Sequence, residues 1–92
     1  MSELDKYIDK NKNRFLEELK EFLRIPSVSN EEKHADDVKK AANWLRDKLA
    51  DVGMENIKIY ETDGHPIVYA DHLHAGNDKP VILVYGHYDV QP

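Results

Sequence analysis

The segment GHYDVQP at residues 86–92 combines residue types that can bind a metal ion. A neutral imidazole is a good zinc ligand, and His87 supplies one. Asp89 follows two residues later, so on an extended backbone its side chain lies on the same side of the chain as that of His87. A carboxylate there can accept a hydrogen bond from the second ring nitrogen and so fix the tautomer and orientation of the imidazole. The pair predicts one metal ligand, His87, and one catalytic residue that orients it, Asp89. The simpler alternative is that His87 caps a strand and Asp89 is a solvated turn residue.

The residues just before this pair predict where it lies in the fold. The segment VILVY at 81–85 is apolar without alternation, which is typical of a central strand covered on both faces. Gly86 allows the backbone to leave such a strand sharply. Ligands of open α/β sheets gather beyond the carboxyl ends of the strands, and His87 is expected at this edge.

Two amphipathic helices are predicted upstream of this strand. In the first, apolar residues recur at spacings of three, four and seven from Leu4 onwards. Ser2 and Asp5 form a capping-box-like start, and Pro26 should end the helix near Arg24.

The second helix is predicted to begin at a capping box formed by Ser29 and Glu32. Gly53 is suited to the left-handed position that ends a helix. The apolar stripe of this helix comprises Ala35, Val38, Ala42, Leu45, Leu49 and Val52.

The period then changes to two, which indicates strands. NIKIYET at 56–62 and PIVYADHL at 66–73 are predicted to form a hairpin around the turn DGHP. The expected fold class is therefore α/β, with two N-terminal helices packed on a partial sheet made of this hairpin and the buried strand. Residues 1–92 are expected to form a portion of a single domain, because a central strand requires more neighbours than the chain offers.

Composition excludes several classes of protein. Hydrophobic residues make up 40% of the chain and charged residues 34%, as in folded globular domains. The net charge of −5 argues against nucleic-acid binding. The absence of cysteine excludes disulfides and thiolate metal sites. No segment resembles a signal peptide or a membrane span, so no membrane partner and a cytoplasmic location are expected.

The other histidines are predicted to play minor roles. His72 and His74 could share one face of a strand end, where exposure to solvent is expected rather than adventitious metal binding. His65 precedes Pro66 in a turn. His34 lies in the first turn of the second predicted helix, among acidic residues.

GHYDVQP after an apolar strand resembles the first metal-ligand motif of metallopeptidase family twenty, which includes carnosinase-like dipeptidases, glutamate carboxypeptidases, aminoacylases and desuccinylases. FLRIPSVS, AANWLRDKLADVGM and GHPIVYADH are similar to the N-terminal region of that family and occur in the same order. The terminal motif resembles the dipeptidase branch in particular.

This resemblance implies an enzyme with two zinc ions, a bridging carboxylate and a glutamate base that activates water to attack an amide. His87 matches the first zinc ligand of the family and Asp89 the carboxylate that orients it. The base, the remaining ligands and the lid or dimerisation domain lie beyond this motif in the family. We therefore expect an incomplete N-terminal portion of a metallo-dipeptidase catalytic domain that is inactive alone and binds zinc weakly. The resemblance implies short peptides as substrate and a homodimeric parent enzyme.

Two alternatives remain open on the sequence. The chain could be a non-catalytic α/β module that self-associates through exposed strand edges. The parent could instead be a hydrolase of N-acyl amino acids, which shares the same metal-ligand motif.

Overall fold

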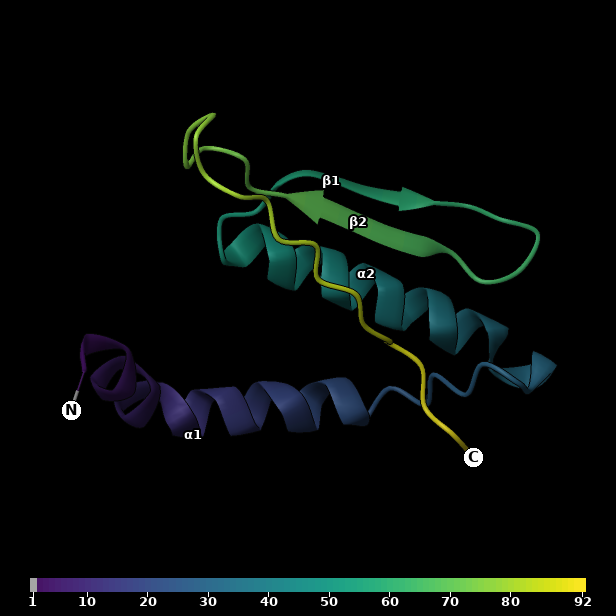
Figure 1. Cartoon of the computed structure of the whole chain (residues 1–92). Coiled ribbons are helices and arrows are strands. Elements are labelled where there is room, and N and C mark those ends of the chain that lie inside the picture. The colour runs from purple at the N-terminus through teal and green to yellow at the C-terminus, as the bar shows by residue number, and fades with distance from the viewer. Residues whose placement is uncertain (1) are drawn as a thin grey trace.

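The computed structural model describes residues 2–92, which form two long helices and one hairpin (Figure 1). Helix α1 spans Glu3–Leu23, and α2 spans Ala35–Asp51. A short 3₁₀ helix, η1 at Glu32–His34, leads directly into α2. Strands β1 (Glu55–Tyr60) and β2 (Ile67–Asp71) follow, and residues 72–92 contain no further helix or extended strand.

Helix α1 begins and ends as its sequence predicts. The backbone amide of Asp5 donates to the Ser2 hydroxyl at 3.1 Å, and the Asp5 carboxylate accepts from the Ser2 amide at 3.3 Å, which completes a capping box. The last helical residue is Leu23 and the C-cap is Arg24, two residues before Pro26. The prediction that Pro26 limits this helix is confirmed.

Helix α2 begins later than its sequence predicts. The expected capping box of Ser29 and Glu32 is wrong, because the N-cap is His34 and η1 occupies the preceding turn. The Ser29 hydroxyl is therefore free for another partner. At the other end, Gly53 has a φ of 89°, the left-handed conformation that its position predicts.

The hairpin is antiparallel, with Lys58 opposite Tyr69 and Tyr60 opposite Ile67. Its register is irregular between Glu55 and Lys58, where Asn56 adopts a positive φ of 51°. The alternation of Ile57 and Ile59 against exposed neighbours follows the predicted period of two.

The core lies between α2 and the hairpin. Val38, Ala41 and Ala42 are the buried residues of α2, while Val52 at its end is 73% exposed, so the predicted stripe is buried mainly in its first half. Among residues 2–92, the other buried side chains belong to the segment between the helices and to the end of the hairpin loop: Ile25, Ser27, Val28 and Pro66.

The α/β class is confirmed, but the expectation that both helices pack on the sheet is wrong for α1. In Figure 1, α2 lies between α1 and the hairpin. Helix α1 contains no buried residue and contacts α2 near its own C-terminal end, where the rings of Phe22 and Trp44 are 4.9 Å apart. Trp44 also donates a hydrogen bond to Glu21 at 2.9 Å.

The predicted buried strand at residues 81–85 is also wrong. These five apolar residues form no strand, and their exposed fractions run from 75% for Val81 to 90% for Leu83. Figure 1 shows the segment crossing α2 and β2 in extended form on its way to the C-terminus. A central strand requires hydrogen-bonding neighbours on both edges, and residues 2–92 provide the segment with none.

Among residues 2–92, neither helix is long and apolar enough to cross a membrane.

Candidate metal site

His87 projects from the segment that follows the apolar run. Its side chain is 73% exposed, so the imidazole is accessible and is not enclosed in apolar packing. The ring stands edge-on to that of Tyr85, with 5.5 Å between the ring centroids. Its Nδ1 faces the carboxylate of Asp89, with 3.5 Å between Nδ1 and Oδ1.

Asp89 is held by a second partner. The Ser29 hydroxyl donates to Asp89 Oδ2 at 2.5 Å, and the Asp89 side chain is only 31% exposed. This hydrogen bond lowers the pKa of the Asp89 carboxyl below its ordinary value of 3.8, because it favours the charged form. A backbone hydrogen bond and His87 lower the pKa further, while desolvation opposes them. Asp89 is therefore a carboxylate at neutral pH, as an orienting partner for an imidazole must be.

Backbone contacts hold the two segments together. The Val90 amide donates to the Ser27 carbonyl at 3.0 Å, and the Ser27 hydroxyl donates to the Tyr88 carbonyl at 3.1 Å. Val28 and Val90 form an isolated parallel bridge. We call this set of contacts between residues 27–29 and 88–90 the clasp. Ser27 is fully buried within it, so the backbone on either side of Asp89 has a fixed path.

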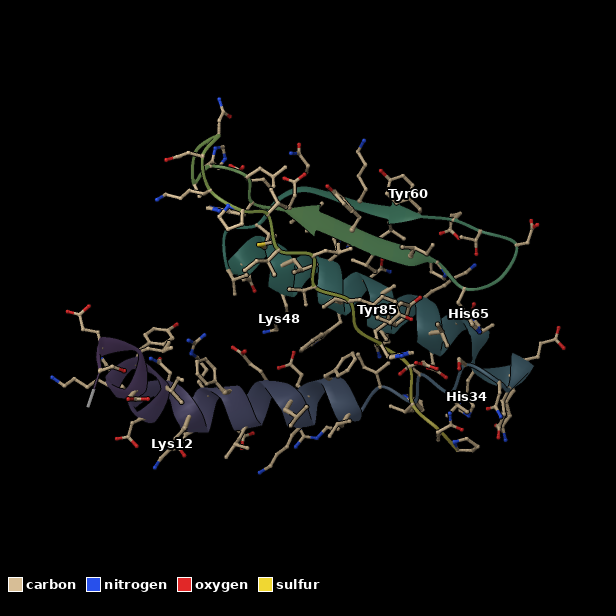
Figure 2. The ribbon with its side chains drawn as sticks, viewed as in Figure 1. Lys12, His34, Lys48, Tyr60, His65 and Tyr85 are labelled. Atoms are coloured by element: carbon tan, nitrogen blue, oxygen red, sulfur yellow. The ribbon has the colours of Figure 1, made fainter. Side chains whose placement is uncertain are left out.

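The hairpin loop adds two further contacts to the clasp. The Tyr88 hydroxyl donates to the Pro66 carbonyl at 2.5 Å, and burial raises the pKa of Tyr88 above its ordinary value of 10.0. His65 Nε2 lies 2.8 Å from the Ser29 carbonyl. Since a carbonyl only accepts, this nitrogen carries the proton. Figure 2 shows His65 beside the end of α2 where the helix begins, and Tyr85 on the segment that crosses α2.

A cavity of about 420 Å³ lies between the clasp and the hairpin. Its polar lining includes Ser29, His65, His87 and Asp89, and its apolar lining includes Val38, Val68 and Val84. An open cavity with a few convergent polar groups is the usual form of a ligand site.

The donors fit one part of a zinc site. With Nδ1 turned towards Asp89, the other nitrogen of the exposed His87 ring is the one suited to a metal. Within residues 2–92, however, no group of three histidine or acidic side chains converges closely enough to hold a metal ion. A zinc site built on His87 needs ligands from outside this set, since catalytic zinc generally has three protein ligands.

The remaining histidines lie elsewhere. His72 and His74 follow the end of β2, with ring centroids 5.3 Å apart, and His74 is 64% exposed and paired with Glu55. The predicted exposure at the strand end is confirmed for both residues. His34, the last residue of η1 and the N-cap of α2, lies 2.8 Å through Nδ1 from Asp37 in the acidic first turn of α2 (Figure 2).

Three residues of this site were given no such role by the sequence: Ser27, Ser29 and His65. Ser29 was predicted to cap a helix and His65 to serve only in a turn. The clasp joins positions 60 to 63 residues apart, and no local pattern reveals so distant a pairing. The available signal was the position of SVS immediately after Pro26, where the chain is extended and its serines cannot serve the first helix.

Curated proteins similar to this chain are dipeptidases, and those named DUG1 are metallodipeptidases. The chain is 38% identical over 96 aligned residues to the Cys-Gly metallodipeptidase DUG1 of Candida albicans. This alignment covers 92% of this chain and 20% of that protein. It is 33% identical over 82 residues to the cysteinylglycine-S-conjugate dipeptidase of Corynebacterium striatum, covering 89% of this chain and 18% of that protein. The Cys-Gly metallodipeptidase DUG1 of Saccharomyces cerevisiae is 30% identical over 96 residues, and the alignment covers 92% of this chain and 20% of that protein.

The chain thus spans about a fifth of the length of the relatives that it matches. No protein-family model matches the chain, and no solved structure matches it significantly. The metallodipeptidase names confirm the resemblance to a metallopeptidase family that the sequence motifs predicted.

Proposed function

From the relationship of this chain to metallodipeptidases, we propose that it is part of the catalytic domain of a zinc-dependent dipeptidase. The observation that carries the proposal is the exposed imidazole of His87, turned towards the Asp89 carboxylate in the lining of a cavity. The same residues form the GHYD segment on which the family resemblance depends. The proposed activity belongs to the complete enzyme, which includes residues outside this chain.

In this proposal His87 is a metal ligand and Asp89 its orienting carboxylate. A bound zinc ion supplies Lewis acidity and lowers the pKa of water enough for attack on an amide carbonyl at neutral pH. Asp89 holds the proton of His87 on Nδ1, and so leaves the lone pair of the other ring nitrogen for the metal. The general base and the other ligands come from the remainder of the enzyme.

We propose short peptides, and dipeptides in particular, as substrates. Two of the relatives are named for Cys-Gly and one for S-conjugates of cysteinylglycine, so a dipeptide with a C-terminal glycine is the first substrate to test. A cytoplasmic location is part of this proposal, and the cysteine-free composition is compatible with it. An N-acyl amino acid is the competing substrate class, and the dipeptidase names of the relatives favour the peptide.

The test is hydrolysis of Cys-Gly and of N-acetylated amino acids by the complete enzyme, before and after metal removal by a chelator. We expect dipeptide hydrolysis that is lost with the chelator and restored by zinc. His87→Ala should lower zinc affinity or activity by at least about 10- to 100-fold, the range measured for changes around metal ligands. His74→Ala is the matched control, since this histidine is exposed and paired with Glu55.

Dipeptide hydrolysis that persists without metal, or that is the same in His87→Ala and wild type, would refute the proposal. Preferential hydrolysis of the N-acetyl substrates would replace the dipeptidase assignment with the alternative. The 92-residue chain alone should show no turnover and only weak zinc binding by calorimetry, because one histidine does not make a tight site.

A further inference from the structure

We propose that Ser29 is a positioning residue, which holds the Asp89 carboxylate in the orientation that faces His87. The catalytic meaning of this role rests on the proposed function, but the orientation itself does not. Ser29 lies 58 positions before His87 in the sequence, at the start of the segment that leads into η1.

The hydrogen bond between Ser29 and Asp89 is a short contact between two residues of the cavity lining. A hydroxyl that donates to a carboxylate at 2.5 Å is a charge-assisted hydrogen bond, which is roughly twice as strong as one between neutral groups. It engages Oδ2, so the other oxygen, Oδ1, is the one that faces Nδ1 of His87 at 3.5 Å. Each oxygen of Asp89 thus has its own partner, and the hydroxyl of Ser29 determines which oxygen faces the ring.

Ser29 is itself fixed from two sides. Its carbonyl accepts a hydrogen bond from His65 Nε2 at 2.8 Å, which ties it to the hairpin loop. Two positions earlier, the Ser27 carbonyl accepts from the Val90 amide at 3.0 Å, which sets the separation between the two backbones. A hydroxyl on a backbone held in this way positions its partner far better than one on a mobile loop.

The structure gives the Ser29 side chain no competing role. The N-cap of α2 is His34 and the N-cap of η1 is Glu31, neither of which makes a side-chain capping hydrogen bond. Within residues 2–92, the Ser29 hydroxyl donates its hydrogen bond to Asp89. Its loss should therefore act on Asp89 and, through it, on His87.

The test is the tautomer of His87, measured from long-range ¹H–¹⁵N NMR spectra of the chain at a pH where the imidazole is neutral. A carboxylate beside Nδ1 favours the tautomer with the proton on Nδ1. In the wild type we expect an excess of this tautomer over that of a free GHYDV peptide. Ser29→Ala should lose the excess, and Ser29→Thr, which retains the hydroxyl, should restore it.

Ser2→Ala is the matched control, because it also removes a hydroxyl bound to a carboxylate, that of Asp5 at the far end of α1. It should leave the His87 tautomer unchanged. A double-mutant cycle then assigns the route: on an Asp89→Ala background, Ser29→Ala should have no further effect on His87. An equal effect with and without Asp89 would overturn the proposal, as would a wild-type tautomer in Ser29→Ala.

If Ser29→Ala fails to fold, Ser29→Cys tests the same role of Ser29. It keeps the shape of the side chain but replaces a strong donor with a weak one, so it should shift His87 towards the free-peptide tautomer. A wild-type tautomer in a folded Ser29→Cys chain would contradict the role of Ser29. These readouts require neither zinc nor turnover. The role of Ser29 can therefore be confirmed while the dipeptidase assignment fails, and it can be refuted while the dipeptidase assignment holds.

Discussion

At the scale of the residue, polar side chains that line the cavity interact with one another. Asp89 binds Ser29 through one oxygen and faces His87 with the other. Tyr88, which lies between His87 and Asp89 in the sequence, donates its hydroxyl to the Pro66 carbonyl.

Tyr88→Phe should destabilise the chain, because it removes the hydrogen bond to the Pro66 carbonyl and leaves this acceptor without its partner. We expect a loss of about 1 kcal/mol in the free energy of unfolding, the usual net value of such a bond. Urea denaturation followed by circular dichroism measures it. Tyr85→Phe is the control and should change stability by less than about 0.5 kcal/mol, since Tyr85 is 82% exposed.

The same tyrosine predicts a dependence on alkaline pH. Burial raises the pKa of Tyr88 in the folded chain above its ordinary value of 10.0. Below pH 10 the hydroxyl is protonated in both states, and its stabilising contribution is complete. As the pH rises past this value the unfolded chain ionises first, so stability falls until the folded state also ionises.

We therefore expect the difference in unfolding free energy between wild type and Tyr88→Phe to decrease above about pH 10. Urea midpoints for both proteins between pH 7 and 11 measure it. Subtraction of the variant removes the contribution of Tyr69, whose pKa is raised by its hydrogen bond to Asp71. A constant difference across this range would contradict a Tyr88 pKa raised by folding.

The sequence predicted the pair at this site but not its support. His87 and Asp89 are two apart, so elementary strand geometry relates them without knowledge of the fold. The structure places them within 3.5 Å of each other, while their roles towards a metal stay a prediction. Ser29 was missed because its own neighbourhood offered a plausible helix-capping role, and local patterns cannot reveal a partner 60 positions away.

At the scale of the element, the two helices depend on the rest of the chain to different degrees. Helix α2 packs against both strands and buries Val38, Ala41 and Ala42, whereas α1 buries no residue. The apolar stripe of α1 is real but largely exposed, with Leu4, Ile8, Leu16, Leu19 and Leu23 each at least 46% accessible. Its attachment to α2 rests on the end that carries Glu21 and Phe22.

Phe22→Ala should release α1 from α2 while leaving both helices formed. The aromatic contact with Trp44 contributes about 0.5–1.5 kcal/mol beyond the burial of its area, and its loss exposes the indole to water. A red shift of the Trp44 emission, with little change in far-ultraviolet circular dichroism, is the expected result.

Phe15→Ala is the matched control for this prediction. Phe15 lies on the same helix and faces Tyr7 and Arg14 of that helix, so its loss should not affect the tryptophan. An equal red shift in both variants would mean that Phe22 does not provide the attachment.

Elements with a complete local pattern were predicted well. Both helices apart from the start of α2, the hairpin, the role of Pro26 and the positive φ of Gly53 follow from periodicity and from the conformational limits of proline and glycine. The segment 81–85 was predicted wrongly, because a strand forms only when it can pair with neighbouring strands. Its apolar composition is suited to the buried position of a central strand, and residues 2–92 do not provide that position.

At the scale of the whole molecule, the distribution of apolar surface is the main anomaly. Five consecutive apolar side chains at 81–85 are at least 75% exposed in a chain whose fully buried side chains are few. Large exposed apolar patches indicate sites of association. Their position along an extended, unpaired segment adds free backbone donors and acceptors to the patch.

We propose that the 92-residue chain self-associates through this segment. Light scattering should show a mass that rises with concentration, and Leu83→Lys should return it towards the monomer, because a charge is disfavoured in such a contact. Leu4→Lys, which places the same charge on an exposed residue of α1, is the control. A constant monomeric mass for the wild type would exclude this association.

The clasp has a consequence for the order in which the chain acquires its structure. Its contacts join positions 60 to 63 residues apart, whereas the capping box, the helices and the hairpin pair positions at most 16 residues apart. The entropy lost on closing such a long loop must be met before these contacts contribute anything, so distant contacts form slowly. We expect the helices and the hairpin to form first and the His87 ring to acquire its orientation last.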